Sequence, residues 1–191
     1  IVILHTNDIH CGINDNIGFA GLAQIKKDAL ARTPNVALVD AGDAIQGAPI
    51  GKLSRGLAVV DIMNYLGYDF CIPGNHEFDY GMDRFMELVP LQRAGYYCAN
   101  FVYAGNNKQV LPGYKIMQYE DNKVAFVGAS TPESLTTSTP TFFQNEKGKY
   151  IYSFCEDKTG NKLYKQLQKN IDKARKDGAD YVFIVGHLGM D

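Results

Sequence analysis

The chain has 191 residues, 46% of them hydrophobic, and its 19 Lys and Arg against 21 Asp and Glu give a formal net charge of −2. This composition supports an apolar core and excludes a disordered or low-complexity chain. The near-neutral charge without a basic block argues against a nucleic-acid partner, and no apolar run approaches the roughly 20 residues of a membrane span.

Four short apolar runs along the chain are typical of strands. They are Ile1 to Leu4, Val36 to Val39, Phe70 to Ile72, and Tyr181 to Val185. Because each run is continuous rather than alternating, we expect these strands to be buried on both faces. We therefore predict that all four belong to one parallel sheet.

Segments with a helical period separate these strands and predict an α/β fold. Apolar side chains recur at three- and four-residue spacing in three stripes: Leu22, Ile25 and Ala29; Val59, Ile62, Met63 and Leu66; Leu163, Leu167, Ile171 and Ala174. Gly67 and Gly178 follow the second and third stripes, where a left-handed helix cap requires no Cβ. Pro90 is expected to end or kink a further helix that begins near Met82.

Two further segments depart from this alternation. Lys115 to Tyr119 and Lys123 to Val127 flank the turn-forming pair Asp121-Asn122 and predict an antiparallel hairpin added to the core. Residues 130–150 are rich in Ser, Thr and Pro and exceed the roughly 15 residues of an ordinary structureless loop, so we expect a functional flap or a mobile excursion.

The cysteines and a series of lysines are expected to have structural rather than functional roles. The four scattered cysteines contain no C-x-x-C pair, which favours buried thiols over a zinc ribbon or a disulfide framework. A lysine series in the last helical segment predicts a solvated helix face. It comprises Lys162, Lys165, Lys169, Lys173 and Lys176.

Side chains that bind metals gather just beyond the carboxyl ends of the predicted strands, where open α/β sheets bind ligands. They are Asp8, His10, Asp43, Asn75, His76 and His187. Each has a plain alternative when taken alone. The triplet Asp8-Ile9-His10 arises often by chance, Asp43 fits an ordinary turn with a capping carboxylate, and His187 fits a core histidine.

The segment from Gly74 to Asp79 is more specific, because it places an amide, an imidazole and carboxylates in one turn. His76 and Asp79 are three residues apart and meet if the turn is helical, in which case the carboxylate favours the protonated ring. Such a ring can donate a proton to a leaving oxygen. The alternative is a helix start, with Asn75 or Asp79 as N-cap and Glu77 in the first turn.

Taken together, these strand ends predict a shared metal centre. The ligands are oxygens and imidazole nitrogens without a thiolate, a set that suits Zn, Mn, Fe or Co. With one carboxylate shared, two divalent ions about 3.5 to 4 Å apart would clamp the attacking and departing oxygens of a phosphoryl group. The residues therefore predict a dinuclear hydrolase.

Four ordered sequence blocks resemble the 5′-nucleotidase branch of the calcineurin-like metallophosphoesterases, and the likeness covers the whole chain. The blocks are Leu4 to His10 (LHTNDIH), Gly42 to Gly47 (GDAIQG), Gly74 to Gly81 (GNHEFDYG), and Gly186-His187. The resemblance implies an α/β fold of the four-layer αββα sandwich type. It also implies two divalent metal ions as cofactors and a nucleotide or related phosphoester as substrate.

The resemblance assigns a role to each matching residue. Asp8 and His10 would hold the first metal, Asp43 would bridge, and Asn75 and His187 would hold the second. His76 and Asp79 would form the catalytic pair, with His76 stabilising the transition state or protonating the leaving ribose oxygen. We expect His5 to be structural, with its ring hydrogen-bonded inside.

The same resemblance implies features that these residues do not contain. The family's last metal motif, Gly-His-x-His, and its carboxy-terminal nucleotide-binding domain are absent, so residues 1–191 are expected to be an incomplete catalytic domain of a longer polypeptide with weak or partial metal occupancy. An extracytoplasmic location is expected from the likeness alone.

Other activities stay open at this point. A 2′,3′-cyclic-nucleotide phosphodiesterase or a nucleotide-sugar hydrolase would use the same centre, and a non-catalytic scaffold would keep the fold without metals. Against the scaffold, all five proposed metal ligands have coordinating side chains.

Overall fold

Two three-stranded sheets face each other in the computed structural model, which describes residues 1–189. The first sheet is parallel and consists, in spatial order, of β1 (Val2–Thr6), β2 (Val36–Asp40) and β3 (Phe70–Cys71). In the second, β6 is antiparallel to β5 and parallel to β8; its strands are β5 (Tyr114–Tyr119), β6 (Asn122–Ser130) and β8 (Tyr181–His187). A separate antiparallel pair is formed by β4 (Val102–Tyr103) and β7 (Tyr152–Ser153).

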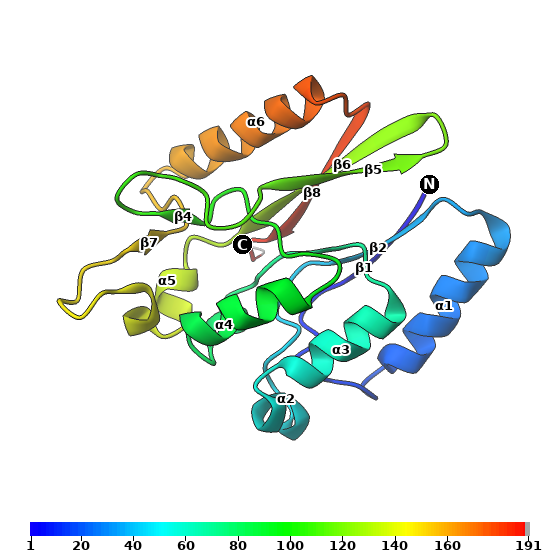
Figure 1. Cartoon of the computed structure of the whole chain (residues 1–191), viewed down its shortest axis with the longest axis horizontal. Coiled ribbons are helices and arrows are strands. Elements are labelled where there is room, and N and C mark those ends of the chain that lie inside the picture. Colours follow the sequence, from blue (N-terminus) through cyan, green and yellow to red (C-terminus); the bar gives the residue numbers. More distant parts are fainter. Residues whose placement is uncertain (190–191) are drawn as a thin grey trace.

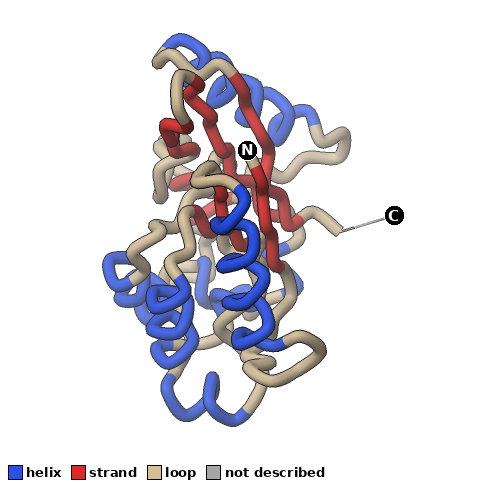
Figure 2. Tube along the Cα trace, turned by 90° about the vertical axis from the view of Figure 1, so that its right-hand side faces the viewer, coloured by secondary structure: helices blue, strands red, loops and turns tan. Residues whose placement is uncertain are grey.

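Helices cover the outer face of each sheet. The helices of residues 1–189 are α1 (Gly18–Arg32), α2 (Pro49–Ser54), α3 (Leu57–Leu66), α4 (Met82–Leu88), α5 (Ser134–Thr137) and α6 (Asn161–Lys176), and the 3₁₀ turns are η1 (His76–Phe78), η2 (Val89–Leu91) and η3 (Pro140–Phe143). Figure 1 shows α6 above the second sheet and α1, α3 and α4 below the first, and the strands lie between these helices in Figure 2. The fold is thus the αββα sandwich of metallophosphoesterases that the sequence resemblance implied.

Alternation along the central strands distributes side chains between the layers. Val39 of β2 and Phe126 of β6 share the core between the two sheets. Leu38 of β2 faces the opposite way, into the core beneath α1 and α3, while Val127 of β6 packs with residues of α6. Both central strands therefore contribute to two cores each, which explains why their sequences are continuously apolar.

The core between the sheets gives a first testable prediction. Phe126 has no exposed surface, and its ring centroid lies 5.8 Å from that of Phe70 and 5.8 Å from that of Phe183. We expect Phe126→Ala to lower the free energy of unfolding by about 3–5 kcal/mol, measured by urea denaturation. The control Tyr65→Ala removes an aromatic ring that is 92% exposed and should change it by less than about 0.5 kcal/mol. Equal effects of the two substitutions would contradict this packing.

The prediction of one sheet for all four apolar runs is wrong for Tyr181 to Val185. This run forms β8, which pairs with β6 in the second sheet, with Tyr181 opposite Val124 and His187 opposite Ser130. The long connection from β6 to β8 contains α6, and this helix packs on β6, as the crossover between two parallel strands of one sheet does. Since either sheet offers covered faces, the apolar run alone does not distinguish them.

Burial on both faces is confirmed for β2 and for the run from Phe70 to Ile72, and it is wrong for β1 and β8. Every residue of β2 is buried. By contrast β1 and β8 end their sheets, and the exposed fractions are 53% for Ile1, 41% for Phe183 and 51% for Ile184. Among residues 1–189, neither β1 nor β8 has a neighbouring strand on its open side, which leaves part of their side chains uncovered.

The predicted helices and the hairpin are confirmed with small differences. Ile25 is 41% exposed rather than part of the buried stripe of α1, and α4 ends at Leu88, before Pro90. The hairpin turn lies one residue earlier than predicted, because Tyr119 already pairs with Asn122, which leaves Glu120 in the turn with a φ of 52°.

Residues 130–150, for which we expect a functional flap or a partly mobile excursion, include regular secondary structure. They contain α5 and η3, and residues Gln144 and Tyr150 form an isolated antiparallel bridge. Phe143 has no exposed surface, and its ring centroid lies 5.1 Å from that of Phe78. This aromatic contact anchors the segment to the turn that follows β3. The composition of residues 130–150 does not predict it, because the partner lies far away in the sequence.

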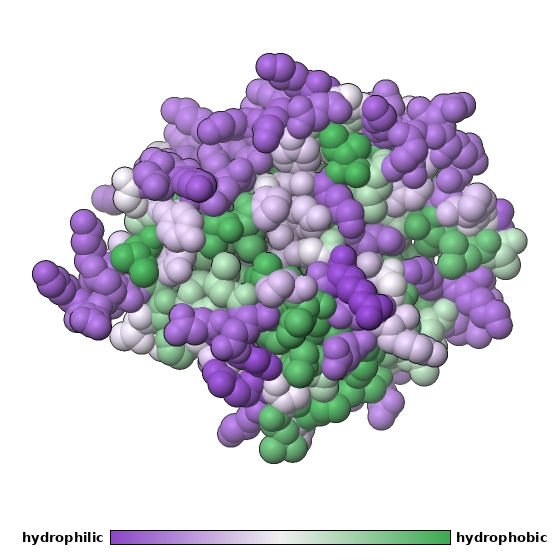
Figure 3. Space-filling model, viewed as in Figure 1, coloured by the Kyte–Doolittle hydropathy of each residue, from purple (hydrophilic) through white to green (hydrophobic). Residues whose placement is uncertain are grey.

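Polar surface covers the outer layer formed by α6. The five lysines of the predicted solvated face are all exposed, and the surface over this helix is hydrophilic in Figure 3. All four cysteines are free, and three of them are buried, as expected. No helix within residues 1–189 has both the length and the apolar composition needed to cross a membrane.

Candidate metal centre

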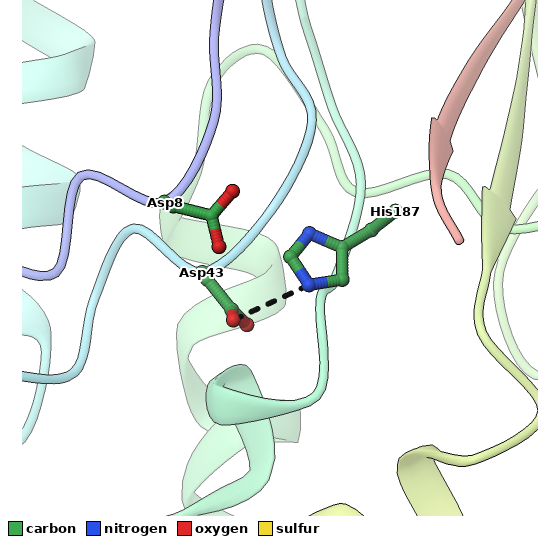
Figure 4. Close-up of side chains that lie close together, drawn as sticks. All are labelled: Asp8, Asp43 and His187. Atoms are coloured by element: carbon green, nitrogen blue, oxygen red, sulfur yellow. Dashed lines mark ion pairs between the residues drawn. The ribbon is translucent and has the colours of Figure 1, made fainter. Parts of the chain in front are cut away.

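Three strand ends bring potential metal ligands together. Asp8 follows β1, Asp43 follows β2, and His187 ends β8, so the cluster lies where the carboxyl ends of the two sheets meet. One ligand atom from each residue lies within 4.8 Å of the others, and Figure 4 shows the three side chains directed toward one another. The strand-end positions of these residues predict the convergence, although the apolar runs alone place all the strands in one sheet.

His10 joins this cluster through its ring. Its Nε2 lies 3.9 Å from Oδ1 of Asp8 and 3.8 Å from Oδ2 of Asp43, while Nε2 of His187 lies 3.3 Å from the same Oδ2. The other ring nitrogen, Nδ1, faces a backbone carbonyl in both histidines, that of Gln46 at 3.2 Å and that of Ala41 at 2.9 Å. An Nδ1–H donated to a carbonyl leaves the Nε2 lone pair free for a cation.

The ligand loops adopt unusual backbone conformations. Asp8, His10 and Asp43 have φ values of 51°, 47° and 59°, in the left-handed region where residues other than glycine are uncommon. Hydrogen bonds between the two loops hold them there: the amide of Asp8 donates to Gly42 O and the amide of His10 to Asp43 O, both at 2.9 Å. Backbone strain of this kind concentrates at functional sites.

Electrostatics within the cluster favour the charged form of Asp43 and a positive charge beside it. Burial raises the pKa of Asp43, but the hydrogen bond with His187 and the bond from the His76 amide outweigh burial, so this pKa lies below its usual value. The same contact with Asp43 raises the pKa of His187 to about 9. Two carboxylates and two imidazole nitrogens are a donor set that fits a divalent ion of the Zn, Mn, Fe or Co type.

His76 and Asp79 form the pair that the sequence predicted. The turn η1 brings His76 Nδ1 to 2.7 Å from Asp79 Oδ2, and Ser138 Oγ donates to the other carboxylate oxygen at 3.3 Å. Partial burial lowers the pKa of His76, but the hydrogen bond to Asp79 and the charge of Asp43 raise it by more. The His76 ring lies edge-on to the His10 ring, with centroids 5.2 Å apart, so the pair adjoins the metal-ligand cluster.

Two further predictions concern Asn75 and His5. Asn75 is half-buried and directly precedes His76, whose amide donates to Asp43 Oδ1 at 2.8 Å. The role of Asn75 as a metal ligand stays a prediction. The expectation that the His5 ring is hydrogen-bonded inside is wrong. His5 is exposed, because β1 is an edge strand with an open side.

Glu77 is a residue of this site that the sequence interpretation missed. Only 1% of it is exposed, and its carboxylate accepts hydrogen bonds from the amides of Asp43 at 2.7 Å, Ala44 at 2.8 Å and Gly74 at 2.6 Å. Burial raises the pKa of Glu77, as does the charge of Asp43, and these amides oppose the rise. In the sequence its position suggests an acidic residue in the first turn of a helix, and only its place between His76 and Asp79 distinguishes it.

Gly74 gives a second testable prediction. A Cβ at this position would overlap Asp43 Oδ1 and lie 2.8 Å from Asp43 Cγ. We expect Gly74→Ala to displace the Asp43 carboxylate and to weaken Mn²⁺ binding by about tenfold or more, measured by calorimetric titration. The control is Gly105→Ala, because a Cβ there meets nothing within 4 Å. Unchanged affinity in Gly74→Ala would show that the close approach is not needed.

Comparison with known proteins was consistent with this geometry. The family model of the calcineurin-like phosphoesterases matches residues 1–191. The snake venom 5′-nucleotidase of Gloydius brevicauda is 29% identical over all of this chain and 33% of its own length. The 2′,3′-cyclic-nucleotide 2′-phosphodiesterase/3′-nucleotidase of Haemophilus influenzae is 26% identical over 98% of the chain and 31% of its own length.

Solved structures agree at the level of the fold. The 5′-nucleotidase precursor of Thermus thermophilus superposes with a TM-score of 0.81 at 25% identity, over 98% of this chain and 37% of that one. The chain thus spans about a third of the length of the curated relatives it matches. Because the family model matches the chain throughout, the chain belongs to the calcineurin-like phosphoesterase family.

Proposed function

We propose that this chain is the metal-binding catalytic unit of a phosphoester hydrolase that releases phosphate from nucleoside 5′-monophosphates. The observation that carries the proposal is the meeting of Asp8, Asp43 and His187 from three strand ends, next to the His76–Asp79 pair. The names of the 5′-nucleotidase relatives support the choice of substrate. A non-catalytic scaffold would have no need of a histidine–carboxylate pair beside its ligands.

The proposed metal ligands are Asp8 and His10 for one ion, Asn75 and His187 for the other, and Asp43 for both. Bound there, divalent cations supply Lewis-acid polarisation of the phosphoryl oxygens and of the attacking water. The residues themselves fix the positions of the ligand atoms, because the buried Asp43 carboxylate is held by the His76 amide while its second oxygen faces the two imidazoles. A site built in this way loses little entropy when ions and substrate enter.

His76 is proposed to stabilise the transition state or to protonate the leaving ribose oxygen. With Nδ1 held by Asp79, the opposite ring nitrogen is free to face the phosphoester, and the raised pKa favours the form that carries a proton there. A protonated ring stabilises the charge that develops on the phosphoryl group or transfers its proton to the leaving ribose oxygen. Asp79 acts through His76, since it fixes the ring's tautomer and orientation.

A cyclic-nucleotide phosphodiesterase activity is the second candidate, favoured by the name of the Haemophilus relative. A location outside the cytoplasm is also part of the proposal, supported by the venom relative.

The test is phosphate release by the purified protein from AMP, 2′,3′-cyclic AMP and a nucleotide sugar, with Mn²⁺ and with a chelator. We expect Mn²⁺-dependent hydrolysis with AMP as the preferred substrate. Preference for the cyclic nucleotide would support the second candidate. Mn²⁺ binding without hydrolysis of any of the three would favour the scaffold.

A further inference from the structure

Glu77 connects the loop that carries Asp43, the proposed ligand shared by both ions, with the loop that carries Asn75. Its Oε2 accepts the amide of Asp43 at 2.7 Å and that of Gly74 at 2.6 Å, and its Oε1 accepts the amide of Ala44 at 2.8 Å and that of Ile45 at 3.4 Å. One loop follows β2 and the other follows β3, so a single carboxylate joins the ends of two neighbouring strands.

No cation neutralises this carboxylate within residues 1–189, where the ion pairs involve other acidic groups. A buried carboxylate is costly unless hydrogen bonds replace its hydration, and here backbone amides are its partners. Such a group stabilises one arrangement of the surrounding backbone, because its lone pairs must each find a donor. The cost of burial is therefore coupled to the positions of both loops.

The contacts are reciprocal across the two loops. While Glu77 accepts the amide of Asp43, the Asp43 carboxylate accepts the amide of His76, the residue directly before Glu77. This second bond occupies Oδ1 of Asp43 and leaves Oδ2 directed at His10 and His187. The loops approach so closely that a Cβ on Gly42 would lie 2.8 Å from the Cα of Gly74. A shift of either loop would consequently move the Asp43 carboxylate.

We propose that Glu77 is a positioning residue that preorganises the metal centre, an inference that rests on the proposed function for the presence of metal. Glu77 touches neither the ions nor the substrate. It holds Asp43 and the Gly74–His76 loop in the binding geometry before any cation arrives, which lowers the entropic cost of metal binding. Its removal therefore acts on metal affinity rather than on the proton transfer assigned to His76.

The experiment compares Glu77→Gln with Glu87→Gln in the 191-residue chain. Glutamine keeps the shape of Glu77 but turns an N–H₂ donor toward backbone N–H donors, so two accepted hydrogen bonds are lost. We expect Mn²⁺ affinity, measured by calorimetric titration, to fall by about 10- to 100-fold in Glu77→Gln, with an unchanged circular dichroism spectrum. Glu87, whose side chain is 63% exposed, provides the matched control with unchanged affinity.

A kinetic measurement separates this role from that of His76. If phosphate release is detected, Glu77→Gln should require more Mn²⁺ for half-maximal activity and recover most of the wild-type kcat when Mn²⁺ saturates. Wild-type Mn²⁺ affinity in a folded Glu77→Gln variant would overturn the proposal. Failure of the wild-type chain itself to bind Mn²⁺ would instead overturn the proposed function.

If Glu77→Gln does not fold, hydrogen exchange on the wild-type chain without metal replaces it. Preorganisation predicts that the amides of Asp43, Ala44 and Gly74 exchange slowly although they lie outside strands and helices. The exposed amide of Gly105, also outside strands and helices, is the internal reference for fast exchange. Fast exchange at all three amides in the metal-free protein would contradict the inference.

Discussion

Replacing His76 with alanine is expected to lower kcat for nucleotide hydrolysis by about 10²- to 10⁴-fold, the usual contribution of a positioned general acid. Mn²⁺ affinity should stay unchanged, because the side chain of His76 is not among the proposed ligands. The His76 amide that donates to Asp43 is also retained in alanine. Steady-state kinetics at saturating Mn²⁺ and calorimetric titration measure the two quantities independently.

The matched control is His5→Ala, which removes an exposed imidazole from β1 and should leave kcat near the wild-type value. A companion variant, Asp79→Asn, should lie between His5→Ala and His76→Ala, since it removes the charge that orients the ring but leaves the ring in place. A wild-type kcat in His76→Ala would refute the assignment of this pair.

Replacing Asp43 with asparagine is expected to reduce Mn²⁺ affinity by more than about 100-fold, beyond the range for residues that only support ligands. The Asp43 side chain is 3% exposed, and its Oδ2 faces both His10 and His187. Asparagine preserves the size of the side chain and one acceptor for the His76 amide, so the main change is the loss of negative charge. Calorimetric titration with Mn²⁺ measures the effect.

Asp61→Asn is the control for this substitution, because Asp61 is exposed on α3. It should bind Mn²⁺ as the wild type does. Equal affinities of Asp43→Asn and Asp61→Asn would mean that Asp43 is not a ligand, and the convergence of the strand ends would then need another explanation.

The order of strands and helices could be predicted because each element carries its own period. The apolar stripe of α3 ends at Gly67, whose φ of 69° confirms the predicted left-handed cap, and the stripe of α6 is followed by Gly178 with a φ of 97°. These are local signals, so a single sequence is enough to detect them.

The sheet to which the run Tyr181 to Val185 belongs could not be predicted, because it depends on which neighbouring strand the run pairs with. The run Tyr181 to Val185 is apolar whether it joins β1, β2 and β3 or pairs with β6, and its composition is compatible with both. The structure selects β6 through the crossover of α6. His187 reaches the cluster all the same, because the carboxyl ends of both sheets meet there.

Within the site, the sequence indicated the residues whose chemistry binds metals and missed the residue that holds the backbone. Asp8, Asp43 and His187 could be selected because carboxylates and imidazoles at strand ends have a direct meaning. Glu77 accepts backbone amides of residues that lie more than 30 positions away, and such contacts leave no pattern in the sequence. The burial of Phe143, which anchors the 130–150 segment against Phe78, escaped prediction for the same reason.

The left-handed conformations of Asp8, His10 and Asp43 were equally invisible to sequence patterns. Hydrogen bonds between the loops after β1 and β2 hold these conformations, which Asp and His adopt more readily than most other non-glycine residues. The close approach of Gly42 to Gly74 belongs to the same arrangement. Strain and close packing at one edge of the fold are the structural signs that agree with the metal-ligand chemistry of the sequence.

Crystals of the chain soaked with Mn²⁺ and measured for anomalous scattering give the most direct test of the metal centre. We expect an anomalous peak in contact with the Asp43 carboxylate and with Nε2 of His187, which the dashed line joins in Figure 4. Anomalous density only at other positions, with Asp43 and His187 still bonded to each other, would contradict it.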